Sequence, residues 1–135
     1  MIDRRAFFKS TATAGAALAL GGIATSASAM GATVVASGTF EGRSNHVTTG
    51  RVKIIEENGR YFVELADDFS LDNGPDPRVA FGKDGSYDPD GYLGALISNT
   101  GQQRYAVPRV WGVDQWNEIY IWCEVAGVPL GVAKY

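Results

Sequence analysis

Two side chains in this 135-residue sequence are candidates for chemistry because each is the only one of its type, Cys123 and His46. A thiol acts as a redox group, a nucleophile or a metal ligand once it has lost its proton. An imidazole acts as a general base, binds a metal or stabilises a neighbouring thiolate. The pair therefore predicts sulfur chemistry if the fold brings the two side chains together.

A purely structural role for each side chain stays open. Cys123 lies in residues 118–125, Glu-Ile-Tyr-Ile-Trp-Cys-Glu-Val, a run rich in β-branched and aromatic residues that predicts a strand. Alternation along that strand places on one face Ile119, Ile121, Cys123 and Val125. A thiol on such an apolar face is expected to be buried, where it behaves as a small hydrophobic group and where the thiolate is disfavoured. The histidine would then be an ordinary hydrogen-bonded side chain near a strand end.

Ligand counting restricts the cofactors. A blue-copper centre needs two histidines and a cysteine, structural zinc needs four Cys or His ligands, and c-type haem needs Cys-x-x-Cys-His. One cysteine and one histidine cannot supply any of these sets, so all three cofactors are disfavoured and no metal site is expected. The acidic residues in 84–90 lack the spacing of an EF-hand loop. Non-covalent haem held by one axial ligand stays open, with Cys123 as the cofactor-binding residue.

The N-terminal residues have the features of an export signal. Arg4 and Arg5 precede an Ala/Gly-rich apolar run at 11–24, and Ala27-Ser28-Ala29 fits a cleavage site. Residues 1–29 are therefore expected to be a signal peptide of the twin-arginine type, and residues 30–135 an exported domain, periplasmic or extracellular. The apolar run is too short and too interrupted for a stable membrane span.

Charge and cysteine content also limit the partners. The whole chain carries a formal charge of −3. Residues 1–29 carry +2, so residues 30–135 carry −5. An acidic domain without a basic cluster argues against nucleic acid as a partner. A single cysteine cannot form an internal disulfide, so an exported chain must bury it, join it to another chain or use its reactivity.

Short β-branched runs separated by Gly, Asn and Pro predict a single all-β, β-sandwich-like domain of antiparallel strands. Residues 83–91 read as a polar surface loop, and Asp114 as the cap of a brief helical turn. Besides 118–125, strands are expected at 33–40, 77–82, 94–97, 103–107 and 127–133. The last should be an edge strand because it contains Pro129.

A hairpin is the firmest structural prediction. Asn58-Gly59 is the preferred dipeptide of a two-residue type I′ turn, because both positions need a positive φ. That turn sets a register with opposite charges across from each other and apolar pairs on one face, namely Glu57–Arg60, Lys53–Glu64, Ile54–Val63 and Val52–Leu65.

Several short motifs occur in one order along residues 36–135. They are Gly38-Thr-Phe40, His46, Thr49-Gly50, Asp68-Phe69, Asn73-Gly-Pro-Asp76, Gly94, Ser98-Asn-Thr-Gly-Gln102, Tyr105-Ala-Val-Pro108 and Ile121-Trp-Cys123. The series resembles the DM-thirteen domain, a small domain found beside DOMON domains and described as an electron-transfer domain. The resemblance implies an exported β-sandwich-like domain. In it, Cys123 matches a signature cysteine associated with redox work, as a bare thiol or by holding a prosthetic group, and His46 matches the histidine before the Thr-Gly pair. The segment 127–131 departs from the more aromatic return strand that the family leads one to expect.

Two functions of different classes follow. The first is an exported redox or electron-transfer accessory domain without necessarily any turnover of its own, with Cys123 as the reactive sulfur and His46 tuning its protonation. Its partner would be a redox protein or a prosthetic group. The alternative is a non-catalytic β-sandwich binding or interaction module whose cysteine is structurally buried. An accessible, readily alkylated sulfur distinguishes the first from the second.

Overall fold

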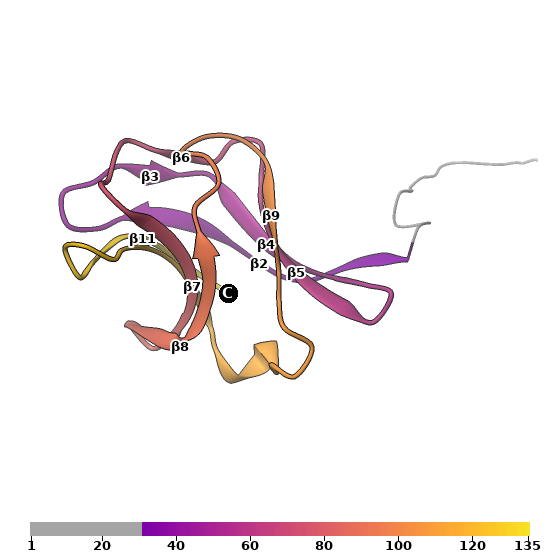
Figure 1. The fold of residues 1–135 in the computed structure, drawn as a ribbon. Helices are drawn as coiled ribbons and strands as arrows, with labels where there is room; N and C mark the ends of the chain where they lie inside the picture. The colour runs from indigo at the N-terminus through magenta and orange to yellow at the C-terminus, as the bar shows by residue number, and fades with distance from the viewer. Residues whose placement is uncertain (1–30) are drawn as a thin grey trace, which may run out of the picture. The chain divides into compact units, whose positions relative to one another are not determined.

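The computed structural model describes residues 31–135, whose regular secondary structure is almost entirely β-strand (Figure 1). One sheet has eight strands in the order β8-β7-β10-β11-β2-β4-β5-β9, and a small sheet pairs β3 with β6. The strands are β2 (Ala32–Gly42), β3 (Thr48–Thr49), β4 (Arg51–Glu57), β5 (Arg60–Leu65), β6 (Ser70–Leu71), β7 (Pro77–Lys83), β8 (Ser86–Ala95), β9 (Gln103–Ala106), β10 (Glu118–Cys123) and β11 (Val128–Lys134). The all-β prediction is confirmed.

The β4–β5 hairpin has the predicted register. Val52 pairs with Leu65 and Lys53 with Glu64, and Glu57 closes the ladder against Arg60. The turn residues Asn58 and Gly59 have φ values of 55° and 78°, as a type I′ turn requires. Local turn chemistry and hydrophobic alternation agree here, so the sequence specifies this element by itself.

The prediction of a polar loop at residues 83–91 is wrong. The chain turns at Asp84-Gly85, with φ values of 52° and 88°, and continues as β8, which pairs antiparallel with β7. Asp-Gly is itself a type I′ dipeptide. The polar residues that follow it, together with Pro89, suit β8 because β8 is an edge strand of the sheet.

The edge position expected for the last strand is also wrong, because β11 lies between β10 and β2. Pro129 is accommodated by an irregularity in the β10–β11 ladder, where Ile121 pairs with Gly131 and the next residue, Trp122, pairs with Pro129. The pairing of β11 with β2 covers residues 131–133, beyond the proline. A bulge is the other place where a sheet tolerates a residue without an N–H.

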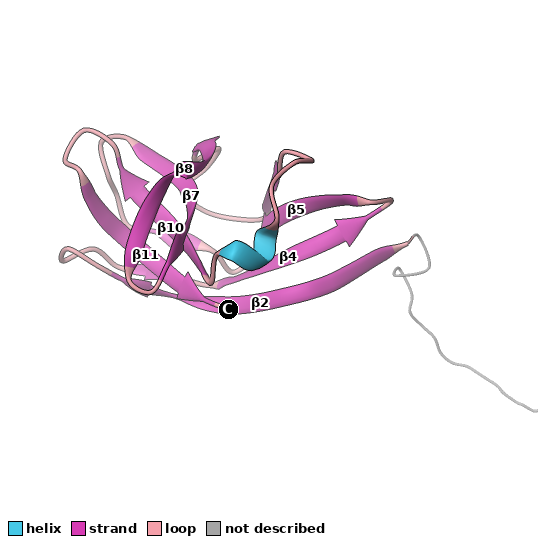
Figure 2. Cartoon of the chain, turned by 90° about the horizontal axis from the view of Figure 1, so that it is seen from below, coloured by secondary structure: helices cyan, strands magenta, loops and turns pink. Residues whose placement is uncertain are grey.

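The sheet curls so that its two edge strands, β8 and β9, contact each other (Figures 1 and 2). The Tyr105 hydroxyl on β9 accepts a hydrogen bond from the backbone N–H of Ile97, just beyond β8, at 2.9 Å. The core fills the inside of the curl, and its aromatic members include the edge-to-face pair Phe40 and Phe69, with ring centroids 5.4 Å apart. These contacts belong to the compact unit Val34–Tyr135.

A short 3₁₀ helix, η2 (Val113–Gln115), precedes β10. Its N-cap residue is Gly112, which makes no side-chain capping bond, so Asp114 lies in the first turn and is not the cap that we expected. Within residues 31–135, no helix is long and apolar enough to cross a membrane. The predicted signal peptide, residues 1–29, lies outside the described residues.

Candidate functional site

Cys123 is the last residue of β10, and its side chain belongs to the hydrophobic core with an exposed fraction of 1%. It pairs with Pro77 on β7 and with Val128 on β11. The prediction that the thiol faces the apolar interior is confirmed. Val125 does not continue the strand, because the chain turns after Cys123 and leaves this side chain 74% exposed.

The sulfur lies directly beneath a surface turn, residues 124–127. The turn is closed by a hydrogen bond from the Gly127 N–H to the Cys123 carbonyl oxygen at 2.8 Å. Gly127 has a φ of +67°, which a residue with a side chain rarely adopts. Within the turn, the Ala126 N–H points at the Cys123 Sγ at 3.4 Å. One backbone turn therefore separates the thiol from solvent and also supplies a donor to the sulfur.

His46 lies in the loop between β2 and β3, where it pairs with an aspartate. Its Nδ1 is 3.0 Å from Asp72 Oδ1. The other carboxylate oxygen, Asp72 Oδ2, accepts the Val47 backbone N–H at 2.9 Å. That backbone bond, followed by the imidazole, lowers the pKa of Asp72 below its ordinary value. The imidazole is thus anchored to an ionised carboxylate at the start of residues 72–77.

Residues 72–77 connect the surroundings of the two predicted site residues. At their start, Asp72 holds His46; at their end, the Asp76 carbonyl oxygen accepts the Glu124 N–H at 3.1 Å and Pro77 pairs with Cys123. Within residues 31–135, no hydrogen bond joins the imidazole to the sulfur. The structure thus places His46 and Cys123 at opposite ends of one segment and not in direct contact.

The same segment contains the Asn-Gly-Pro-Asp motif, and its geometry explains two of the motif's residues. A Cβ on Gly74 would lie 2.7 Å from the end of the Leu130 side chain, so glycine lets the segment pack closely on β11 without displacing that side chain. The Asp76 carboxylate accepts two hydrogen bonds from the Arg78 guanidinium, from Nε and Nη2, both at 3.0 Å. This fork fixes the segment to β7.

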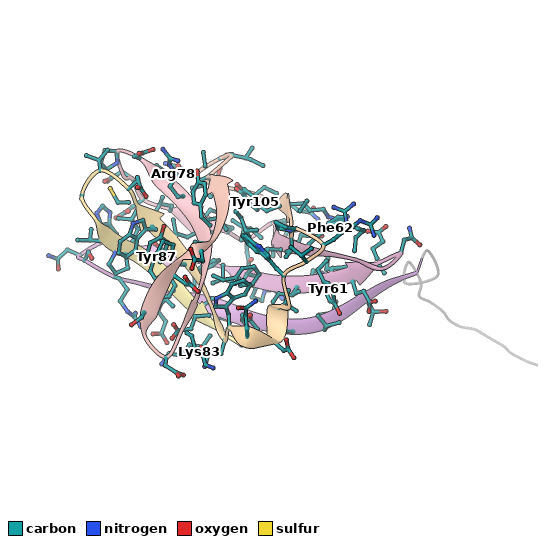
Figure 3. All side chains as sticks on the ribbon, turned by 60° about the horizontal axis from the view of Figure 1, so that its bottom comes forward. Tyr61, Phe62, Arg78, Lys83, Tyr87 and Tyr105 are labelled. Atoms are coloured by element: carbon teal, nitrogen blue, oxygen red, sulfur yellow. The ribbon has the colours of Figure 1, made fainter. Side chains whose placement is uncertain are left out.

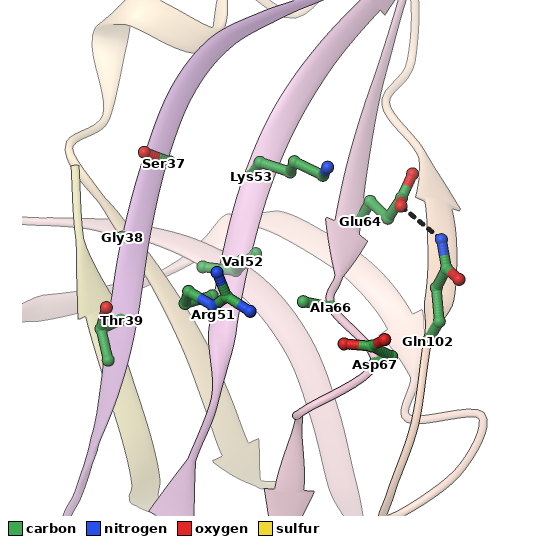
Figure 4. A pocket seen from close by; sticks show the side chains of 10 residues that line it. All are labelled: Ser37, Gly38, Thr39, Arg51, Val52, Lys53, Glu64, Ala66, Asp67 and Gln102. Carbon is green, nitrogen blue, oxygen red and sulfur yellow. Dashed lines mark hydrogen bonds between the residues drawn. The ribbon is translucent and has the colours of Figure 1, made fainter. Parts of the chain in front are cut away.

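The surroundings of the sulfur do not fit a haem. A haem ligated by Cys123 would need an open face beside the sulfur for its ring, and the 1% exposed side chain has none. The hollow in Figure 4, about 590 Å³ in volume, has walls from Thr39, Arg51, Lys53 and Glu64. Two further hollows of about 470 and 560 Å³ are likewise lined without Cys123 or His46. Among the described residues, no three His, Cys, Asp or Glu side chains gather as a metal site.

A cluster of aromatic side chains on the outer face of the sheet was not predicted. Tyr87 on β8 stacks on Trp122 on β10, and Tyr120 meets Tyr87 edge-to-face. Burial and the neighbouring Glu118 carboxylate raise the pKa of Tyr120 to about 12. Alternation along β10 places Tyr120 and Trp122 opposite Cys123, but Tyr87 lay in the segment read as a loop, so its partner could not be seen from the sequence.

The comparisons with known proteins agree with the resemblance read from the motifs. A family model described as electron transfer DM13 matches residues 39–135. That match spans β3 to β11 and includes Cys123, His46 and residues 72–77. No curated protein and no solved structure gives a significant match. On the strength of the family match, this chain belongs to the DM13 electron-transfer family.

Proposed function

We propose that the chain is an exported electron-transfer accessory domain in which the Cys123 sulfur exchanges electrons with a redox partner. Membership of the electron-transfer family supports the redox role. The observation that carries the assignment to Cys123 is its position: the only thiol of the chain lies under a single turn that also directs an N–H at the sulfur. A donor aimed at the sulfur favours negative charge on it, as a reactive thiol requires.

The chemistry proposed is that of a bare thiol. Loss of one electron to the partner and of one proton to water leaves a thiyl radical, and the reverse step restores the thiol. The proton needs a path to water, which residues 124–127 provide when the turn opens. Because these residues are mostly exposed and held by few hydrogen bonds, they belong to the part of the fold that opens at low cost.

Alkylation tests the access route. The full-length chain is treated with iodoacetamide at neutral pH without denaturant, and modification of Cys123 is followed by mass spectrometry. Gly127→Ala forces a side chain into positive φ at a cost of roughly 1 kcal/mol, so about a fivefold faster reaction is expected. Gly112→Ala is the matched control, because Gly112 has an ordinary φ of −91°. Equal rates in all three proteins would contradict opening at this turn.

His46 is proposed to act on the sulfur indirectly, as a positioning residue. His46 is hydrogen-bonded to Asp72 at the start of residues 72–77, and this segment ends at Pro77, which pairs with Cys123. Fixing Asp72 therefore helps to fix Pro77 beside the sulfur. His46→Ala should therefore change the alkylation rate of Cys123, whereas His46→Asn, which can still donate to Asp72, should restore it. Equal rates in both variants and the wild type would mean that His46 does not act on the Cys123 sulfur.

The binding module remains the second candidate, and the 1% exposure of Cys123 favours it. In that function the thiol only fills space in the hydrophobic core, and the tryptophans contribute to the core and to an interface. Trp116 already belongs to the core, where it stacks on Phe81 with ring centroids 4.4 Å apart. If the thiol reacts only after denaturation in every variant and the exported protein has no visible absorption, the binding module is correct.

Export is proposed from the paired arginines and the cleavage site in residues 1–29. A twin-arginine signal depends on both arginines, so replacing Arg4 and Arg5 with lysine should keep the chain inside the cell while preserving charge. Immunodetection in fractionated cells measures this. Undiminished export of the lysine variant would mean that another route is used.

A further inference from the structure

Two aromatic rings from strands that are not neighbours meet on the outer face of the sheet. The rings of Tyr87 on β8 and Trp122 on β10 are 4.0 Å apart between centroids and 7° from parallel. Strand β7 runs between these two strands. Arg78 on β7 and Tyr87 on β8 can be followed in Figure 3, where both are labelled. Each ring must therefore lean over β7 to reach the other.

The sequence of β7 makes this contact possible. At the outward positions of β7, Arg78 pairs with Trp122, and its guanidinium is hydrogen-bonded to Asp76. The next two outward positions are Ala80, which pairs with Tyr120, and Gly82, which pairs with Tyr87 and Glu118. A Cβ on Gly82 would collide with the Tyr120 ring and lie 2.5 Å from the Ser86 carbonyl oxygen. Small residues at both positions leave the middle strand flat, so the aromatic rings from both sides can cover it.

The stacked pair is joined to the buried sulfur by the chain itself. Trp122 directly precedes Cys123 in β10, so the indole and the thiol lie on opposite faces of one strand, linked by a short covalent path. The thiol is 1% exposed, whereas Trp122 and Tyr87 are each partly exposed. A partner protein can therefore touch the aromatic pair but not the sulfur.

We propose that the Tyr87–Trp122 pair is the port through which electrons pass between a redox partner and Cys123; this inference rests on the proposed function. The partner is a protein carrying a one-electron oxidant strong enough to take an electron from a thiol, such as a ferryl haem. One electron leaves the sulfur, passes through Trp122 and reaches the partner's redox centre, whose oxidation state falls by one. The thiol proton passes to water at residues 124–127, and a thiyl radical remains. A one-electron reductant reverses each transfer.

The charges around the port indicate the kind of surface that the partner presents. Glu124 and Asp88 lie near Tyr87, and together with burial, which is the larger cause, they raise the pKa of its phenol. The phenol therefore stays protonated and neutral at physiological pH. Arg78 also lies near Tyr87, and the Asp88 carboxylate accepts a hydrogen bond from the Trp116 indole, so the charge at the pair itself is mixed. The net charge of −5 on residues 30–135 favours a partner with a basic face, which speeds encounter.

The test uses photogenerated tris(bipyridine)ruthenium(III), a soluble cationic one-electron oxidant, with the full-length chain. Transient absorption follows the indole radical, and the remaining thiol is titrated after denaturation. Trp122→Phe removes the indole but keeps a ring against Tyr87, and Trp111→Phe is the matched control in the interior aromatic cluster. Cys123→Ser removes the final electron donor. Circular dichroism checks that each variant is folded.

If the port is correct, Trp122→Phe slows loss of the thiol by about tenfold, while Trp111→Phe leaves the rate unchanged. Cys123→Ser keeps the indole radical and lengthens its lifetime. Equal rates of thiol loss in the two tryptophan variants would overturn the port while leaving the proposed function intact. An indole radical in the wild type with no loss of thiol would instead overturn the redox role of Cys123, and the port with it.

Discussion

Aspartates at the ends of strands tie loops to the sheet through backbone N–H groups. Asp68 accepts the Arg51 N–H and the Arg51 guanidinium, both at 3.0 Å, and Asp72 accepts the Val47 N–H. These bonds stabilise the ionised carboxylates, with the backbone bond the largest cause in each case, and lower the pKa of both. Asp68 and Asp72 therefore act as specific hydrogen-bond acceptors.

Acid should weaken the fold through these two carboxylates. Because the pKa of each is lower in the folded state, their stabilisation is complete above the unfolded value, about 3.9, and is lost as the pH falls through the folded values. Melting temperatures measured from pH 7 down to pH 2 should fall most steeply below pH 4. Asp68→Asn and Asp72→Asn should lower the melting temperature at pH 7 and flatten that fall. Profiles parallel to the wild type would contradict this account.

Gly82 is the residue on which the outer aromatic cluster depends most. Gly82→Ala places a methyl group against the Tyr120 ring and the Ser86 carbonyl, and overpacking of this kind costs about 1–3 kcal/mol. Urea denaturation measures the loss. Gly112→Ala, where the nearest contact of the new Cβ is the Asp114 carboxylate at 3.1 Å, should be close to neutral. A neutral Gly82→Ala would mean that the rings do not lie on this glycine.

At the scale of elements, the β4–β5 hairpin shows what sequence can predict. Its turn dipeptide, charge pairs and apolar face are all local, and they specify one register. The β7–β8 hairpin was missed because polar residues and Pro89 imitate a loop, and only its edge position, which is set by the whole sheet, makes them compatible with a strand. The same tertiary context explains why Pro129 does not mark an edge.

The β4–β5 turn gives a test that involves only the backbone. No atom lies within 4 Å of a Cβ built on Gly59, and its φ is +78°. Gly59→Val should therefore cost about 1–2 kcal/mol from conformation alone. Asn58→Gly, at the other turn position, should be nearly neutral. Urea midpoints measure both, and equal effects of the two substitutions would argue against a type I′ turn here.

At the scale of the whole molecule, the curl of the sheet brings the family motifs together. His46, residues 72–77 and Cys123 come from three separate parts of the chain and form one connected region. The sequence predicted the buried face of the thiol, which the structure confirms. It could not show that residues 72–77 lie between them or that a turn covers the sulfur, because both depend on how β10 sits between β7 and β11.

We propose that Cys123 is the redox centre of this DM13 domain. Protein-film voltammetry of the full-length chain beside Cys123→Ser tests it most directly, because serine keeps the size of the side chain and removes its redox chemistry. We expect a one-electron response in the wild type that the serine variant lacks. The same response in both proteins, or none in the wild type, would contradict it.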